Sequence, residues 1–298
     1  MPSQHFAQLS DPHLSTPAGA RLGDLIGKRG LGYLSWRRRR RFEHRREVLE
    51  ALCSDLAGLD CSQVLVTGDL THIGLPSEFD QAASWLAQLG PPEQVAVIPG
   101  NHDACVSVAP ELGLLQWRDY LASDNAAGGS FPSLRVRGHI AFIGLSTACP
   151  TPPLMASGTL GNAQLADLAA LLEQQAGRFR VVYLHHSPVA GAEIWRKRLT
   201  DAAGFRRVIA EQGAELVLHG HGHRARWEEI ESPQGKRPVI AVPSASARGL
   251  HGADRAAYNR YSVSPADGGW ELQVASRCYD PDSGEVLDGE RRKYTLRN

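Results

Sequence analysis

The sequence has no excess of charge of either sign, no long apolar run and no internal repeat. Lys+Arg and Asp+Glu both number 32, so the net charge favours no class of binding partner. No apolar run reaches the roughly 18 residues that a membrane-spanning helix needs. With 42% hydrophobic and 21% charged residues, the composition is that of an ordinary globular protein. Because no clear linker interrupts the chain, we expect one domain over residues 1–298.

The cysteines are too scattered, and odd in number, for a disulfide framework, and they form no Cys-x-x-Cys pair. Reduced thiols in a cytosolic protein are the simpler interpretation. The chain also enters a predicted strand at about His5, which leaves no room for a signal peptide. We therefore expect a cytoplasmic protein, with peripheral contact at the inner face of the membrane left open. The cysteines are Cys53, Cys61, Cys105, Cys149 and Cys278.

Apolar, β-branched runs alternate with helical patterns through most of the chain. The run 63–67 is typical of a buried strand, whereas 77–89 and 162–175 carry apolar residues at helical spacing. Ser77 is expected to cap the first of these helices. From about Trp227 onward the chain turns to short β-segments. The alternation predicts an α/β fold with a β-rich C-terminal part.

Five predicted strands end in residues that can bind a metal. The carboxyl edge of an α/β sheet is where such folds bind ligands, so these residues are expected to meet there. Any one of them could be a buried hydrogen-bond donor or a helix cap. Those explanations fail jointly, because each motif follows an apolar strand and none begins a simple capping pattern. The motifs contain Asp11 and His13, Asp69, Asn101 with His102 and Asp103, His185 with His186, and His219 with His221 and His223.

The donor set mixes carboxylate and amide oxygens with imidazole nitrogens. Such a set suits Mn, Fe, Zn or Co better than copper or a thiolate-loving ion. Two metals about 3.5–4 Å apart would need a bridging carboxylate and would share a hydroxide of lowered pKa. That arrangement is suited to in-line attack on phosphorus. A single structural zinc site is the smaller alternative.

These motifs resemble, in the same order, those of the calcineurin-like metallophosphoesterase superfamily. The matching segments are Asp11-x-His13, Gly68-Asp69, Gly100 to Asp103, His185 and Gly220-His221-x-His223. The resemblance implies an αββα architecture, a two-sheet β-sandwich flanked by helices, with a dinuclear centre on its loops. It also implies a hydrolase that cleaves a phosphodiester or pyrophosphate bond by attack of a metal-bridging hydroxide.

The resemblance also implies roles for single residues. Asp69 would bridge the two metals, and His102 would be the general acid for the leaving oxygen or would stabilise charge on the phosphoryl group. The first metal would be held by Asp11, His13, Asp69 and His223. The second would be held by Asp69, Asn101, His185 and His221.

The sequence departs from the family pattern at His72, where many members carry an acidic residue in Gly-Asp-x-x-Asp. Asp103 or Thr71 could then orient His102, or His72 could contact a substrate phosphate. His186 is expected to point away from the metal that His185 binds, in a supporting or purely structural role.

Other histidines lie outside the ligand set. His219 is interpreted as a supporting or rim residue, and His44 matches no motif. Arg248 and His251 lie in a stretch that could reach the substrate.

An insertion at about 14–41 combines apolar and aromatic residues with the arginine run Arg37 to Arg41. It could be a solvated helix face or a partly ordered loop. It could also be a cap beside the metals whose apolar residues meet lipid and whose arginines meet phosphate. Nucleic acid ranks lower, because the segment is rich in aliphatic residues and no recognition motif accompanies it.

The insertion favours an amphipathic substrate, such as a lipid-linked or nucleotide-linked pyrophosphate of the UDP-diacylglucosamine type. The alternatives are a cyclic-nucleotide or glycerophosphodiester phosphodiesterase and a phosphomonoesterase. A non-catalytic scaffold on the same fold is the remote alternative, because no predicted ligand has been lost.

Overall fold

The computed structural model describes all residues except 1, 125, 127–128, 251–253 and 298. Its first sheet has six strands in the order β12-β11-β10-β1-β2-β3. The strands that carry the first three motifs run parallel at one side, and a C-terminal antiparallel meander extends the other. The bounds are β1 (Gln4–Leu9), β2 (Gln63–Val66), β3 (Val95–Val97), β10 (Ala257–Ala266), β11 (Gly269–Tyr279) and β12 (Val286–Arg297).

The second sheet also has six strands, in the order β4-β5-β6-β7-β9-β8. Its four central strands are parallel, and antiparallel strands β4 and β8 form its edges. The bounds are β4 (Ser133–Arg137), β5 (Ile140–Gly144), β6 (Phe179–Tyr183), β7 (Leu216–His219), β8 (Arg226–Ile230) and β9 (Arg237–Ala241).

Alternation along the strands creates one core between the sheets and one on each outer face. In β1, Phe6 belongs to the central core, whereas Ala7 and Leu9 belong to the outer one. The Phe6 ring stacks on Tyr261 of the same sheet, with centroids 4.6 Å apart, and meets Phe142 of the other sheet edge-on at 5.1 Å. These aromatic contacts hold the two sheets together in the central core.

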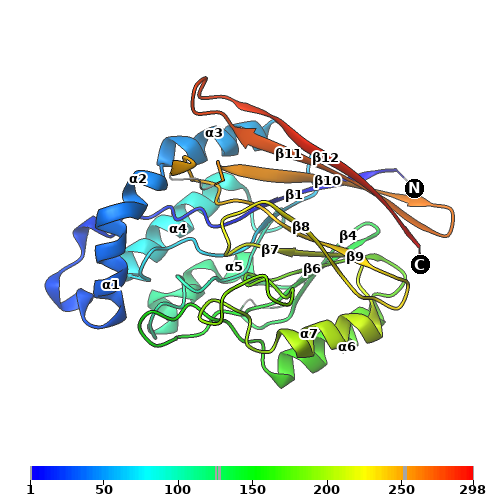
Figure 1. Ribbon diagram of the computed structural model, residues 1–298, viewed down its shortest axis with the longest axis horizontal. Helices are drawn as coiled ribbons and strands as arrows, with labels where there is room; N and C mark the ends of the chain where they lie inside the picture. Colours follow the sequence, from blue (N-terminus) through cyan, green and yellow to red (C-terminus); the bar gives the residue numbers. More distant parts are fainter. Residues whose placement is uncertain (1, 125, 127–128, 251–253, 298) are drawn as a thin grey trace.

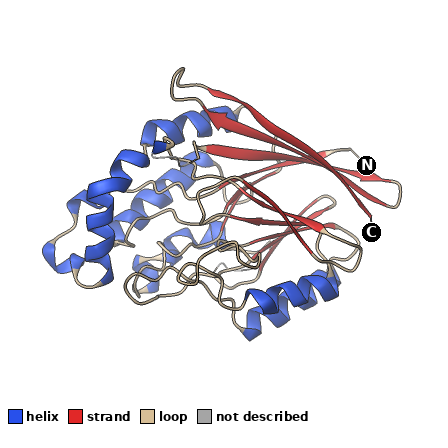
Figure 2. Ribbon diagram, in the orientation of Figure 1, coloured by secondary structure: helices blue, strands red, loops and turns tan. Residues whose placement is uncertain are grey.

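Helices cover the outer face of each sheet (Figure 2). Helices α3 (Arg46–Ala57), α4 (Pro76–Leu89) and α5 (Arg118–Leu121) pack on the first sheet. Helices α6 (Asn162–Gln174) and α7 (Ala202–Gln212) pack on the second. The predicted αββα architecture is confirmed.

The N-terminus of α4 differs from the prediction. Ser77 was expected to be the cap, but the helix begins at Pro76, so Ser77 lies inside its first turn. The buried carboxylate of Glu78 takes over the capping role, accepting hydrogen bonds from three backbone amides within 72–75 and from the Ser15 hydroxyl. Proline fits the first helical position, and a glutamate two residues later can reach back over it. Glu78 therefore fixes the loop that follows Asp69.

The insertion is mostly helical. After two short 3₁₀ turns, α1 (Lys28–Ser35) continues through a π-helical turn over Trp36–Arg40 into α2 (Arg41–Glu43). It lies at the end of the molecule opposite the two chain termini (Figure 1). Its first half leaves apolar side chains in solvent, with Leu22 90% and Ile26 79% exposed.

All five cysteines are free thiols, in agreement with the prediction of reduced cysteines. Across the part of the chain that the structure describes, we find no helix that is both long and apolar enough to cross a membrane.

Candidate metal centre

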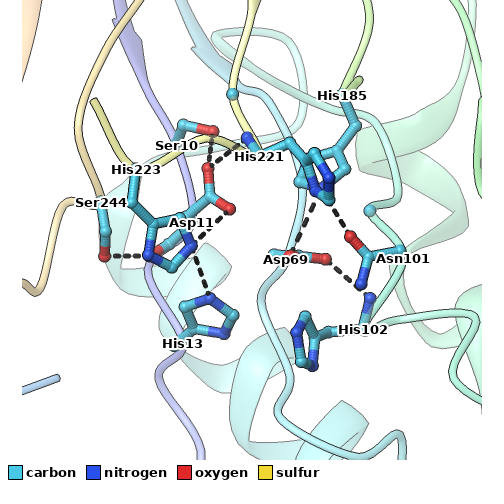
Figure 3. A network of polar contacts seen from close by, with 12 residues as sticks. Ser10, Asp11, His13, Asp69, Asn101, His102, His185, His221, His223 and Ser244 are labelled. Carbon is cyan, nitrogen blue, oxygen red and sulfur yellow. Dashed lines mark hydrogen bonds and ion pairs between the residues drawn. The ribbon is translucent and has the colours of Figure 1, made fainter. Parts of the chain in front are cut away.

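The predicted motifs converge where β1, β2, β3, β6 and β7 end (Figure 3). The loops after β1 and β2 are joined directly by their main chains. The amide of Asp11 donates to the carbonyl of Gly68 at 3.0 Å, and the amide of His13 donates to the carbonyl of Asp69 at 3.0 Å. Parallel pairing of the two strands thus continues into the loops and brings both carboxylates to the same edge.

Five of the predicted ligands have a left-handed main chain, which is costly for residues other than glycine. Such residues each cost about 1–3 kcal/mol, and strain of this kind clusters at functional sites. Here the side chain is needed for its donor atom, so glycine cannot replace it. The φ angles are 50° at Asp11, 41° at His13, 58° at Asp69, 66° at His221 and 51° at His223.

The glycines of the motifs are required by close packing. A Cβ on Gly68 would lie 2.6 Å from Nδ1 of His185, and one on Gly100 would overlap the carboxylate of Asp69. Neither position can carry a side chain without moving a predicted ligand.

The first cluster contains Asp11, His13, Asp69 and His223, whose donor atoms all lie within 4.8 Å of one another. Nδ1 of His13 lies 3.1 Å from the carbonyl oxygen of Thr71, so this nitrogen carries the proton and Nε2 is left with a lone pair. That Nε2 is 3.2 Å from Nε2 of His223, which in turn is 3.1 Å from Oδ1 of Asp11. These side chains therefore point donor atoms at a common centre.

The second cluster contains Asp69, His185 and His221, with Asn101 beside it. Nδ1 of His185 donates to the carbonyl of Thr67 at 2.7 Å, which again leaves Nε2 facing inward. This Nε2 is 3.3 Å from Oδ2 of Asp69 and 3.3 Å from Oδ1 of Asn101. Nε2 of His221 is buried and has no hydrogen-bond partner among the residues that the structure describes. Asp69 belongs to both clusters, as expected of a bridging ligand.

The electrostatics of this arrangement fit a bound cation. Burial by itself would lower the pKa of His185, but the charge of Asp69 raises it to about 10. The cluster thus favours positive charge between Asp69 and His185, and a divalent metal would supply it. The mixed oxygen and nitrogen donors suit Mn, Fe or Zn.

Asp103 holds the loops together without joining either cluster. Its carboxylate accepts hydrogen bonds from the amides of Asp69 and Gly100, both at 2.9 Å, and from the amide and hydroxyl of Thr71 at 2.9 and 3.0 Å. Burial and the nearby charge of Asp69 raise the pKa of Asp103 to about 7.

Neither of the two side chains expected to orient His102, those of Asp103 and Thr71, hydrogen-bonds to its ring. Nδ1 of His102 instead donates to the main-chain carbonyl of His72 at 2.5 Å. The ring of His72 is only 2% exposed and stacks on His13 with centroids 5.1 Å apart, so it is poorly placed for the suggested contact with a substrate phosphate. A backbone carbonyl thus orients His102, where an acidic side chain was expected to do so.

The remaining predicted residues lie outside the two clusters. His186 is buried, bonds to the Thr147 hydroxyl at 2.7 Å and packs against His221 with ring centroids 4.4 Å apart. His219 is buried at the end of β7. The side chain of Arg248 is exposed, and His251 lies outside the described residues.

A cavity of about 550 Å³ opens onto the site, and the insertion forms one of its walls. Asp69, Asn101 and His102 line it together with residues from the helix of the insertion. Nη1 of Arg40 lies 2.7 Å from Nε2 of His102. The cationic side chains around the cavity are Arg38, Arg39, Arg40, Lys197 and Arg224.

His44, which follows α2, is a site residue that the motifs did not reveal. Its ring lies 4.4 Å from that of His13 and 5.4 Å from that of His223, centroid to centroid. It follows no strand and belongs to no recurring spacing, so the sequence carried no signal for it beyond its nearness to the arginine run.

A family model described as calcineurin-like phosphoesterase matches residues 4–225. The chain belongs to the calcineurin-like phosphoesterase family. A probable cyclic nucleotide phosphodiesterase from Synechococcus sp. is 26% identical over 214 residues, which cover 71% of this chain and 75% of that protein. A solved structure of PhoD has a TM-score of 0.57 and 12% sequence identity, covering 100% of this chain and 72% of that one.

This calcineurin-like phosphoesterase is accordingly a phosphoester hydrolase. The family is dinuclear and metal-dependent, and the His and Asp clusters described above supply the candidate ligands.

Proposed function

We propose that the chain hydrolyses an anionic phosphodiester or pyrophosphate with two metals that share Asp69. Asp11, His13 and His223 would complete the first site, and Asn101, His185 and His221 the second. The proposal rests on one observation: side-chain oxygen and nitrogen atoms that could bind a metal converge on both sides of Asp69. When bound, Mn, Fe or Zn ions would supply Lewis acidity at phosphorus and lower the pKa of water.

His102, in the loop after β3, and Arg40, in the insertion, both line the cavity and would act on the phosphoryl group. Nη1 of Arg40 lies 2.7 Å from Nε2 of His102 and 3.1 Å from its Nδ1, and Nδ1 donates to the carbonyl of His72. Burial and the charge of Arg40 hold the pKa of His102 well below its usual range. A neutral His102 favours the second of its two expected roles. The pair would stabilise charge on the phosphoryl oxygens, with Arg40 as the main source of positive charge.

The cations of the cavity wall support a substrate with more than one anionic group. Arg38 and Arg39 lie on the same helical segment as Arg40, and Lys197 and Arg224 face them from loops of the second half. A guanidinium group matches a phosphate in geometry as well as charge. A nucleotide-linked pyrophosphate or phosphodiester fits this wall, and the Synechococcus relative is described as a cyclic nucleotide phosphodiesterase.

A lipid-linked pyrophosphate of the UDP-diacylglucosamine type is the second candidate. It is favoured by exposed apolar side chains on the insertion, next to the arginines. These are Leu22, Ile26, Leu31, Leu34 and Phe42.

The hydrolase proposal is tested with Asp69→Asn and Asn101→Ala in a manganese-dependent assay of bis(p-nitrophenyl) phosphate. Each variant should lose nearly all turnover, because a shared or second-metal ligand is gone. Asp119→Asn, at an exposed position of α5, is the matched control and should keep full activity. Normal turnover by both ligand variants would refute the proposal.

The substrate class is tested by comparing substrates in the double variant Arg38→Ala/Arg39→Ala. KM for a nucleoside diphosphate ester should rise about tenfold or more, whereas KM for the simple diester should change little. An equal change for both would remove the argument for a second anionic group. The lipid alternative predicts that Leu22→Ser/Ile26→Ser impairs hydrolysis of a lipid-linked pyrophosphate in micelles and spares its water-soluble headgroup analogue.

A further inference from the structure

The end of the insertion is clamped to the segment 244–250, far away in sequence. The amide of Arg45 donates to the carbonyl of Ser246 at 2.9 Å, and the amide of Arg248 donates to the carbonyl of Glu43 at 3.0 Å. The Glu43 carboxylate also accepts the amides of residues 249 and 250 at 2.9 and 3.0 Å. His44 lies between these bonds, so its main chain is fixed on both sides.

The clamp brings the His44 ring to the first cluster. One nitrogen of His44 lies within 4.8 Å of donor atoms of both His13 and His223. The three residues come from the insertion, the loop after β1 and the loop after β7.

The hydrogen bonds of His44 determine which nitrogen is free. Nδ1 lies 2.9 Å from the hydroxyl of Ser246 and 3.2 Å from that of Ser244. Because the Ser244 hydroxyl donates its own proton to the carbonyl of Asp11 at 2.6 Å, its oxygen is free to accept a proton from Nδ1 (Figure 3 shows Ser244 beside Asp11). In the tautomer that makes this bond, Nδ1 carries the proton and Nε2 keeps its lone pair.

The same arrangement occurs at two of the predicted ligands. His13 and His185 also place Nδ1 against an oxygen outside the cluster and turn Nε2 inward. A histidine that binds a metal almost always donates its other ring N–H in this way, which fixes its tautomer and orientation. A histidine that donated a proton to a substrate phosphate would instead need a hydrogen on Nε2.

We propose that His44 is an additional ligand of the metal that Asp11, His13 and His223 hold. The insertion then completes the metal centre as well as forming the cavity wall, and metal binding would fasten the insertion in place. The proposal rests on the metal centre of the proposed function and is independent of the substrate.

The experiment measures metal binding to His44→Ala by calorimetry and equilibrium dialysis with Mn, and by the visible spectrum of the cobalt-loaded protein. Affinity at one of the two sites should fall by about 10- to 100-fold, with the other site unchanged, and the cobalt bands should change in intensity. His13→Ala is the positive control, and His5→Ala, at the start of β1, is the matched histidine control. Unchanged affinity and an unchanged cobalt spectrum in His44→Ala would overturn the proposal.

A second variant tests the tautomer argument without removing the ligand. Ser246→Ala takes away the nearer acceptor of Nδ1, so affinity at the same site should fall by a smaller factor, up to about tenfold. An unchanged affinity would contradict the role given to Ser246. The two proposals fail separately. If His44→Ala binds metal fully and Asp69→Asn is inactive, the hydrolase proposal stands and the His44 proposal fails. If His44→Ala loses metal and Asp69→Asn is active, the His44 proposal stands and the hydrolase proposal fails.

Discussion

Asp103 makes four hydrogen bonds and belongs to neither metal cluster. It lies beside Asn101 and His102 in the sequence, and the motif alone gives no means of separating its role from theirs. The roles of these residues differ because their side chains point in different directions. The Asp103 carboxylate points into the loop after β2, while Asn101 points at the cluster. A strand-end motif predicts that polar side chains gather, but the local main chain decides which of them reach the metals.

Asp103→Asn should lower the free energy of unfolding by about 2 kcal/mol. An amide offers one oxygen in place of two, so at least one buried amide near Asp69 or Gly100 loses its partner. Urea denaturation is the measurement, with Asp80→Asn on the outer face of α4 as the control. An unchanged denaturation midpoint would contradict this account of Asp103.

Arg40→Ala should lower kcat/KM for the simple diester by about 100-fold, because it removes a positive donor aimed at the phosphoryl position. Arg46→Ala is the matched control, since Arg46 is exposed and pairs with Glu50 on α3. Steady-state kinetics with saturating metal measures the effect. If Arg40→Ala stayed within threefold of the control, Arg40 would have no direct role in turnover.

At the scale of elements, the site residues that follow strands could be predicted from the sequence, whereas those in and next to the insertion could not. The strands carry a clear apolar pattern that places the polar residues after them at one edge of the sheet, and the family resemblance then named seven of these residues as ligands. The insertion carries no such pattern. Five consecutive arginines on a helix point in different directions, and only the structure shows that Arg38, Arg39 and Arg40 face the cavity. His44 depends on pairing with a segment some 200 residues later in the chain.

Glu43→Ala should loosen the insertion without touching a predicted ligand. It removes the acceptor for two amides at 249 and 250, so the insertion should open more often. Limited trypsin digestion should cut the arginine run about tenfold faster in this variant. Glu50→Ala, an exposed residue of α3, is the control. Equal cleavage rates in the two variants would show that the clamp does not hold the insertion.

At the scale of the whole molecule, the metal centre joins loops from both sheets. Asp11, Asp69 and Asn101 follow strands of the first sheet, whereas His185 and His221 follow strands of the second. Bound metals would therefore add bonds across the sandwich, in addition to the aromatic contacts between the sheets. The layer order followed from the family resemblance, whereas the alternation of strand and helical patterns predicted only an α/β fold. The C-terminal meander was foreseen only as short β-segments, because β12 is largely exposed and polar.

Mn should raise the melting temperature of the wild-type protein, since a ligand that binds only the native state stabilises it. At a free metal concentration 100 times Kd the gain is about 2.7 kcal/mol for one site. For a chain of this size that corresponds to a rise of several degrees. Addition of EDTA should reverse the shift, and Asp69→Asn should show little of it. A melting temperature indifferent to metal in the wild type would contradict a metal centre that bridges the sheets.

The position of β1 also has a consequence for synthesis. β1 is synthesised well before β10, which begins at Ala257 and pairs with one of its edges. His223 and Ser244, which contact the loop after β1 or lie close to it, likewise come late in the chain. Asp11 and His13 can therefore meet the loop after β2 early, but they gain their contacts with His223 and Ser244 only after those residues have been made. We expect a ribosome-bound chain stalled before β10 to hold no metal, and a chain released past β11 to acquire it in one cooperative step.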